Sequence, residues 1–312
     1  MNLTRRPSLG WALIIASSLL FGLNASTTKV LVHAGFDPTF LVPYRSSATA
    51  VLALIAVLVT NPKGLKVGLK ELGTLALFGA VGLALMQWSY TNAVSRLPVG
   101  ISLLIEYTAA IWVPLANWAI YKRKPARGLW LGVAVAIVGL LAVSSFWNAQ
   151  LDPVGIMFAA MTALFVTFYF LIAEHTQSSR DVWSTLFYSM TFSAAFWWIL
   201  TPPKPGSIPD LSHLIALGGN LAPAAYSGWV MLSWVGIMGS FVPMLLNYLA
   251  IRFIDTNSVG VGSLSEVVFA FLFGFLWLAE SVTGIQLVGS VLVLIGILVA
   301  QRATAIKPDS GQ

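Results

Sequence analysis

Long apolar stretches follow one another along almost the whole chain, separated by short polar connectors. A helix that crosses about 30 Å of hydrocarbon, at about 1.5 Å per residue, needs about 20 mostly apolar residues. Connectors such as residues 201–206, with three prolines, contain the Pro and Gly residues that end helices. The pattern predicts an all-α integral membrane protein with ten transmembrane helices: Leu9–Val32, Phe40–Val59, Leu72–Val94, Val99–Tyr121, Leu129–Phe146, Pro153–Ala173, Val182–Leu200, Tyr226–Ile251, Asn257–Ala279 and Gly284–Ala300.

The composition excludes an ordinary soluble enzyme. Of 312 residues, 58% are hydrophobic and only 9% are charged, whereas soluble domains carry about 25% charged residues. Lipid is therefore the expected solvent for most of the surface. The absence of cysteine excludes a disulfide scaffold, a thiolate nucleophile and a Cys-ligated metal.

The net charge of +6 reflects how Lys and Arg are distributed between the connectors. If the N-terminus is cytoplasmic, the outer connectors hold only Arg96 and Lys204. Cytoplasmic connectors are enriched in Lys and Arg, so we predict a multi-pass protein of the inner (plasma) membrane with both termini cytoplasmic, and no nucleic-acid partner. The residues on the cytoplasmic side would be Arg5, Arg6, Lys63, Lys66, Lys70, Lys122, Arg123, Lys124, Arg127, Arg180, Arg252, Arg302 and Lys307.

The second half of the chain repeats features of the first. Residues 99–106 resemble residues 259–266, 160 positions later, and Phe21, Asp37 and Tyr44 recur as the same residue types 144 positions later. Because five helices is an odd number, the second copy starts on the opposite side of the membrane. We therefore predict two inverted five-helix repeats, residues 1–147 and 148–312, in one compact membrane domain. Secondary transporters use this arrangement for alternating access around a midplane site.

Two glutamates lie at matching positions inside predicted helices. An ionisable residue at membrane depth costs about 2.5–3.5 kcal/mol on insertion scales, so it usually faces an interior or aqueous space. Glu106 and Glu266 each follow the Val-Gly start of their helix by seven residues. They could line a central cavity and bind a cation or carry a coupling proton. The alternative is a structural role in capping backbone groups near a helix end.

Other polar and aromatic residues lie on helical stripes that could face the same cavity. Small polar residues can also join transmembrane helices, aromatic residues can simply pack, and cations can extend to the headgroups. With both interpretations open, the candidate substrate-binding residues are Asn24, Lys29, Tyr44, Arg45, Gln87, Trp88, Tyr90, Glu106, Tyr107, Trp112, Tyr169, Tyr188, Asn247 and Glu266.

Motifs for enzymatic chemistry or ATP hydrolysis are absent from the sequence. It has no Walker-type P-loop, no His-Glu-x-x-His and no Gly-x-Ser-x-Gly, and its three histidines share no metal-binding spacing. We therefore expect no enzyme activity, catalytic residue, metal or cofactor. Any energy for transport would come from a gradient.

Two segments resemble EamA-type transporters of the drug/metabolite transporter superfamily. Leu264–Ala270 resembles the signature of the last two helices, and Leu104–Ala110 is its first-half counterpart. The family pattern has proline at the positions that Val267 and Ala110 occupy here. The resemblance implies a central cavity enclosed by helices one to four and six to nine, with helices five and ten peripheral.

The resemblance also implies a substrate class. Known relatives export amino acids and other small metabolites, or exchange phosphorylated and nucleotide-linked solutes. A phosphate-binding member would gather several cations in its cavity, whereas this chain offers Lys29 and Arg45. We therefore expect a monomeric exporter of small zwitterionic or weakly charged metabolites, with protons as a candidate coupling ion. A passive channel, a membrane enzyme and a receptor on the same scaffold are the alternatives.

Overall fold

A computed structural model describes residues 6–94, 96–97, 99–122, 125–144, 152–202, 210–279 and 283–305. The predicted boundary between the repeats, at residues 147 and 148, lies outside them, as do Arg5, Arg123, Lys124, Lys204 and Lys307. The helices are α1 (Pro7–His33), α2 (Pro38–Thr60), α3 (Leu69–Leu77), α4 (Met86–Val94), α5 (Val99–Glu106), α6 (Ala109–Tyr121), α7 (Arg127–Ser144), α8 (Pro153–Ser179), α9 (Val182–Leu200), α10 (Gly228–Gly236), α11 (Val242–Phe253), α12 (Thr256–Ser263), α13 (Ser265–Leu276) and α14 (Gly284–Ala305).

Helix occupies each of the ten predicted ranges, and the chain is an all-α membrane protein in its architecture. Within the described residues, nine helices are long and apolar enough to cross a membrane. The helix α9 is not one of them, because five serines and threonines lower the mean hydropathy of its 19 residues. A count of ten membrane spans therefore remains a prediction.

A short hairpin precedes α10, where the sequence predicted only a connector. Its strands are β1 (Leu214–Ala216) and β2 (Ala225–Ser227), which pair antiparallel. The predicted eighth helix therefore begins at Gly228 and not at Tyr226. The Trp277 Nε1 donates a hydrogen bond of 3.0 Å to the carbonyl oxygen of Leu217, which fixes the hairpin to the end of α13.

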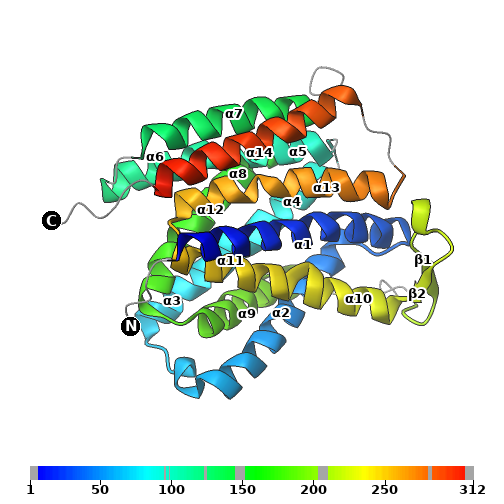
Figure 1. Cartoon of the computed structure of the whole chain (residues 1–312). Helices are drawn as coiled ribbons and strands as arrows, with labels where there is room; N and C mark the ends of the chain where they lie inside the picture. Colours follow the sequence, from blue (N-terminus) through cyan, green and yellow to red (C-terminus); the bar gives the residue numbers. More distant parts are fainter. Residues whose placement is uncertain are drawn as a thin grey trace.

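The helices α7 and α14 lie side by side at one edge of the bundle (Figure 1). A Cβ added to Gly132 would lie 2.6 Å from the carbonyl oxygen of Gly296, and one added to Gly139 would lie 2.6 Å from that of Gly289. Because the residue numbers run in opposite directions along the contact, the two helices are antiparallel. Glycine is required at these positions because the backbones touch.

A second antiparallel pair is formed by α2 and α9. The Ser46 Oγ lies 3.1 Å from the Ser193 Oγ near the middle of the pair. At its end, the Asn61 side chain, which follows α2, donates a hydrogen bond of 3.3 Å to Asp181, which precedes α9. Each pair thus joins one helix from each half of the chain.

The helices that carry the two glutamates are interrupted beside them, although neither interruption contains proline. The chain leaves the α-helix between α5 and α6, and again at Leu264 between α12 and α13. Threonine and serine hydroxyls bond to carbonyl groups at both breaks: the Thr108 Oγ1 donates to Ile105 at 2.6 Å, and the Ser265 Oγ donates to Gly262 at 2.7 Å. Such side-chain bonds to the backbone accompany both breaks, in helices where the family pattern has proline.

Wider π-helical turns interrupt two further helices at corresponding places in the halves. One, Phe78–Leu85, joins α3 to α4, and the other, Ile237–Phe241, joins α10 to α11. Such turns leave carbonyl groups free for other partners and are frequent at functional sites. In the second turn, the carbonyl oxygen of Gly239 accepts a hydrogen bond from Arg45.

Candidate functional site

A cavity of about 820 Å³ lies between the two halves of the chain. Its walls come from α1, α2, α4, α5, α8, α9, α11 and α13, with two residues from the end of α7 and single residues from the ends of α12 and α14. This volume is within the range of sites for small molecules. Both halves therefore contribute to one cavity.

The cavity reaches only one end of the bundle. Its lining includes Lys29 and His33 at the end of α1, Leu41 near the start of α2 and Leu278 after α13. Within α1, the lining begins at Ser17 and includes nothing nearer the N-terminus. We call the end that contains Lys29 the mouth and the opposite end the closed end.

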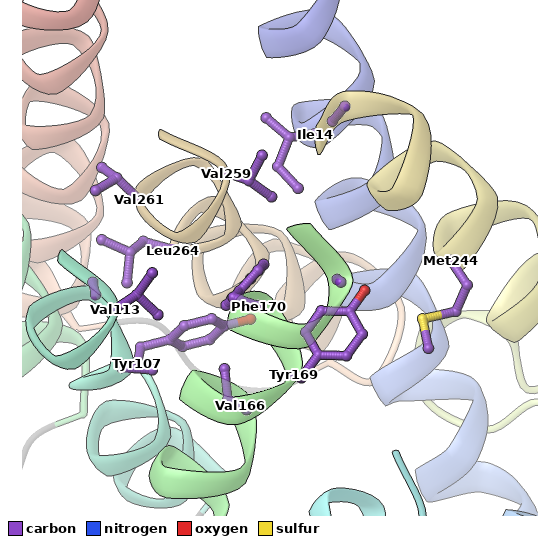
Figure 2. Packing of buried hydrophobic residues seen from close by; sticks show 14 of the residues in the cluster. Ile14, Tyr107, Val113, Val166, Tyr169, Phe170, Met244, Val259, Val261 and Leu264 are labelled. Carbon is purple, nitrogen blue, oxygen red and sulfur yellow. The ribbon is translucent and has the colours of Figure 1, made fainter. Parts of the chain in front are cut away.

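Buried apolar side chains fill the space below the cavity toward the closed end. Figure 2 shows Ile14 of α1, Val259 of α12, Val113 of α6 and Phe170 of α8 converging on one region between the helices. Ile14, Val113 and Val259 have no exposed surface. Passage of a solute through this region would require the helices to separate.

Glu266 is held by a residue from the other half of the chain. The Tyr107 Oη donates a hydrogen bond of 2.6 Å to the Glu266 Oε2. Tyr107 lies in the interruption after α5, and Glu266 lies in the first turn of α13, where the helix N-terminus favours a carboxylate. The two residues are therefore placed by the breaks in their helices.

Glu106 lines the same cavity but is not held in this way. Its Oε2 is buried and receives no hydrogen bond from the described residues. The two carboxyl groups are close enough to interact electrostatically. A buried polar atom without a partner is costly, so the Glu106 oxygen is the group most in need of a proton, a cation or a solute donor.

The Arg45 side chain extends from α2 to the π-helical turn Ile237–Phe241 in the second half of the chain. Its Nε donates a hydrogen bond of 2.6 Å to the Ser240 Oγ, and its Nη2 donates one of 3.0 Å to the carbonyl oxygen of Gly239. The side chain lines the cavity and lies within electrostatic reach of Glu266. These bonds fix the guanidinium in position and place positive charge near Glu266.

Amide and phenol groups complete the polar wall. The Tyr169 Oη donates a hydrogen bond of 3.1 Å to the Asn247 Oδ1, and the buried Oδ1 of Asn24 accepts none from the described residues. Gln87, Tyr90 and Lys29 also line the cavity. Of the predicted candidates, the structure brings together Asn24, Lys29, Arg45, Gln87, Tyr90, Glu106, Tyr107, Tyr169, Asn247 and Glu266.

The structure places four predicted candidates outside this cavity. Tyr44 stacks on Phe40 at 5.9 Å, and Trp88 lines a separate pocket of about 170 Å³. Trp112 is 48% exposed on α6, because it lies on the face of that helix that turns away from the bundle. Tyr188 lies near the closed end, where its Oη donates a hydrogen bond of 2.7 Å to the carbonyl oxygen of Leu65.

Sequence reasoning did not select several residues of the wall. Phe21, Ser46 and Thr49 line the cavity. Helical spacing could have identified two of them. Phe21 lies three residues before Asn24, and Thr49 lies four residues after Arg45, so each shares a helix face with a selected residue. In the described part of the chain, no group of three or more His, Asp and Glu side chains could hold a metal ion.

The comparison with known proteins covers nearly the whole chain. The model of the EamA-like transporter family matches residues 8–145 and again residues 153–301. An uncharacterized transporter of Bacillus subtilis, YdfC, is 22% identical over 289 residues, which are 91% of this chain and 89% of that protein. An uncharacterized transporter of Archaeoglobus fulgidus is 23% identical over 226 residues, 71% of this chain and 76% of that protein.

A solved crystal structure has the same fold. It superposes with a TM-score of 0.77 at 15% sequence identity, over 96% of this chain and 98% of the other. At this identity the likeness concerns the fold alone. Together with the two family matches, which span most of the described helices, it leads to one conclusion: the chain belongs to the EamA-like transporter family.

Proposed function

We propose that the protein is a secondary transporter that exports small metabolites such as amino acids by alternating access. The observation that carries the proposal is the cavity between the two halves, which reaches one end only and contains one glutamate from each half. A cavity open at both ends would be a pore. A cavity closed by packed side chains at one end is what a carrier presents in one of its two states.

Two inverted five-helix repeats are part of this proposal. The antiparallel pairs α2 with α9 and α7 with α14 each join helices of equal rank in the two halves, as inverted repeats require. The family model also matches the chain twice, once in each proposed repeat. Rocking of one repeat against the other would then close the mouth and open the closed end.

The predicted membrane orientation assigns a side to each end. With the N-terminus cytoplasmic, the mouth is on the outer side, because it lies where α1 ends and α2 begins. The cavity is then outward-facing, in the state from which a solute would be released during export.

The charges of the cavity favour a zwitterion. The unpartnered Oε2 of Glu106 can accept a hydrogen bond from an ammonium group, or carry a coupling proton. The guanidinium of Arg45 can pair with a carboxylate. A phosphorylated or nucleotide-linked solute, which is the alternative, would find the doubly negative phosphate facing two glutamates with Arg45 as its nearest buried cation.

Purified protein in liposomes would test this function. Uptake of radiolabelled amino acids should saturate with concentration and should accelerate when unlabelled solute is enclosed inside, because a carrier returns faster when loaded. The doubly substituted protein Glu106→Gln, Glu266→Gln is the matched control. Flux that rises linearly without counter-exchange would indicate a channel, and retention of the wild-type flux and pH dependence by the control would overturn the role of the glutamates.

A further inference from the structure

A cluster of polar side chains joins the two halves at the closed end. Arg180, in the turn between α8 and α9, has a side chain that is only 6% exposed. Its Nε donates a hydrogen bond of 2.6 Å to the Glu71 Oε1 on α3. Its Nη1 and Nη2 donate to the carbonyl oxygens of Gly64 and Lys66, the latter at 3.0 Å. The Arg180 guanidinium thus binds both the connection between α2 and α3 and the first turn of α3.

Neighbouring residues strengthen the same contact. The Tyr188 ring lies 5.5 Å from the Arg180 Cζ, in the geometry of a cation–π interaction. From α11, the Arg252 Nη2 donates a hydrogen bond of 2.7 Å to the carbonyl oxygen of Arg180. The hydrogen bond from Arg180 to Glu71 raises the pKa of Arg180, so its guanidinium stays charged at any pH in a cell.

The cluster is far from the cavity mouth. It contacts the residues that follow α2, whereas the mouth contains residues near the start of that helix. At 1.5 Å per residue, the 23 residues of α2 separate the two places by about 33 Å. The apolar cluster around Ile14 and Phe170 lies between the cavity and this end.

Comparison of matching positions in the two halves indicates that the closed end has the Arg180 contact and the end with the mouth does not. With the offset of 144 residues, Arg180 corresponds to Phe36. The next residues of both turns match in sequence and role, because Asp37 and Asp181 each accept a hydrogen bond from the backbone N–H of the helix that follows. Phe36, however, is 2% exposed and packs with Ile215, Leu217, Met231 and Trp277. The same position therefore carries a packed phenylalanine at the end with the mouth and a guanidinium at the closed end.

We propose that Arg180 and its partners form the gate of the closed end, a polar latch that must open for a solute to leave or enter the cavity on that side. The proposal rests on the proposed transport function. Each hydrogen bond of the latch can be exchanged for one with water when this end opens. The latch therefore suits an end that opens to solvent in every cycle.

A reversible disulfide tests whether this end must move. A Cβ added to Gly64 would lie 3.3 Å from the Ser184 Cβ, slightly below the usual spacing of about 3.5–4.5 Å in disulfides, and 2.8 Å from the Asp181 Oδ2, so that carboxylate must shift. The chain has no cysteine of its own. We expect oxidised Gly64→Cys, Ser184→Cys protein to lose flux in liposomes and to regain it on reduction. The single variants are the matched controls. A verified disulfide with undiminished flux would overturn the gate.

A labelling experiment tests the latch without any solute. Thr185 is fully buried one turn along α9 from Asp181. In a Thr185→Cys background, Arg180→Ala should raise the rate of reaction with a membrane-impermeant maleimide at least about tenfold, the change expected for one lost charge-assisted hydrogen bond. Arg180→Lys should give a smaller increase. An unchanged rate in Arg180→Ala would refute the latch.

The control variant and the wild-type protein separate the two proposals. Arg127→Ala, at an exposed arginine that begins α7, removes the same charge away from the latch and should leave the labelling rate unchanged. If wild-type protein shows no solute flux while Arg180→Ala still raises labelling, the transport function fails, and only the finding that Arg180 keeps this end closed stands. If flux is normal and labelling does not change, only the gate fails.

Discussion

The hydroxyl group of Tyr107 donates a hydrogen bond of 2.6 Å to the carboxylate of Glu266, across 159 positions of sequence. The residue beside Tyr107, Glu106, is the repeat counterpart of Glu266, and its Oε2 has no such donor in the described structure. Two acids that match in sequence therefore differ in their surroundings. One accepts a hydrogen bond within the protein, and the other is left to a ligand or a proton.

Removal of the tyrosine hydroxyl should destabilise the protein. Because a hydrogen bond to a charged group is worth about 1.5–3 kcal/mol and a neutral one about 0.5–1.5 kcal/mol, Tyr107→Phe should lower the unfolding free energy more than Tyr169→Phe, which removes only the bond to Asn247. Thermal unfolding in detergent measures both. Equal losses would mean that Glu266 is not charged in the resting protein.

Replacement of the Glu106 carboxyl group by an amide should reduce transport without lowering the stability of the protein. Glu106→Gln keeps the shape of the side chain and removes an unpartnered buried acid, so we expect an unfolding temperature at or above that of the wild type. Solute flux should fall about tenfold or more, equivalent to about 1.4 kcal/mol. Ser102→Ala, one turn earlier, is the control and should keep its flux. Normal flux in Glu106→Gln, with an unchanged pH profile, would contradict the assignment.

Lysine should not restore the solute binding that we expect of Arg45. It keeps the charge but lacks the planar fork that reaches both Ser240 and Gly239. We expect Arg45→Lys to raise KM for a carboxylate-bearing solute several-fold with a smaller change in kcat. Ser240→Ala, which leaves the guanidinium in place, should have a smaller effect on KM. If Arg45→Lys has the wild-type KM, the arginine only joins helices.

Alanine should not be tolerated where α7 meets α14. In Gly139→Ala, the new Cβ would lie 2.6 Å from a carbonyl oxygen, and overpacking of this kind costs about 1–3 kcal/mol. Gly73→Ala is the matched control because nothing lies within 4 Å of its Cβ, and it should stabilise α3 by about 0.5–1 kcal/mol. Unfolding temperatures that move in the same direction would contradict the contact.

The helices could be predicted from sequence because their length is dictated by the membrane. Hydropathy located each helical range, and the spacing between Val99 and Glu106 drew attention to both acids. Helical stripes also led to most of the polar wall, since residues three or four apart share a face. These are local patterns, which a single sequence contains.

Long-range polar contacts could not be predicted in the same way. The bond between Tyr107 and Glu266 and the contacts of Arg180 depend on which helices are neighbours. Arg180 was visible in the sequence only as one of many cytoplasmic cations. The breaks without proline were also missed, because hydroxyl groups such as that of Thr108 accompany them and threonine is common in helices that do not break.

The close approach of α7 and α14 limits how the protein can move. Glycine meets glycine at two levels along this contact, so any slide of one helix along the other would drive a side chain into a backbone. If the two halves rock as proposed, this contact would serve as the fulcrum, and the axis of the motion would lie at the edge of the bundle rather than at its centre.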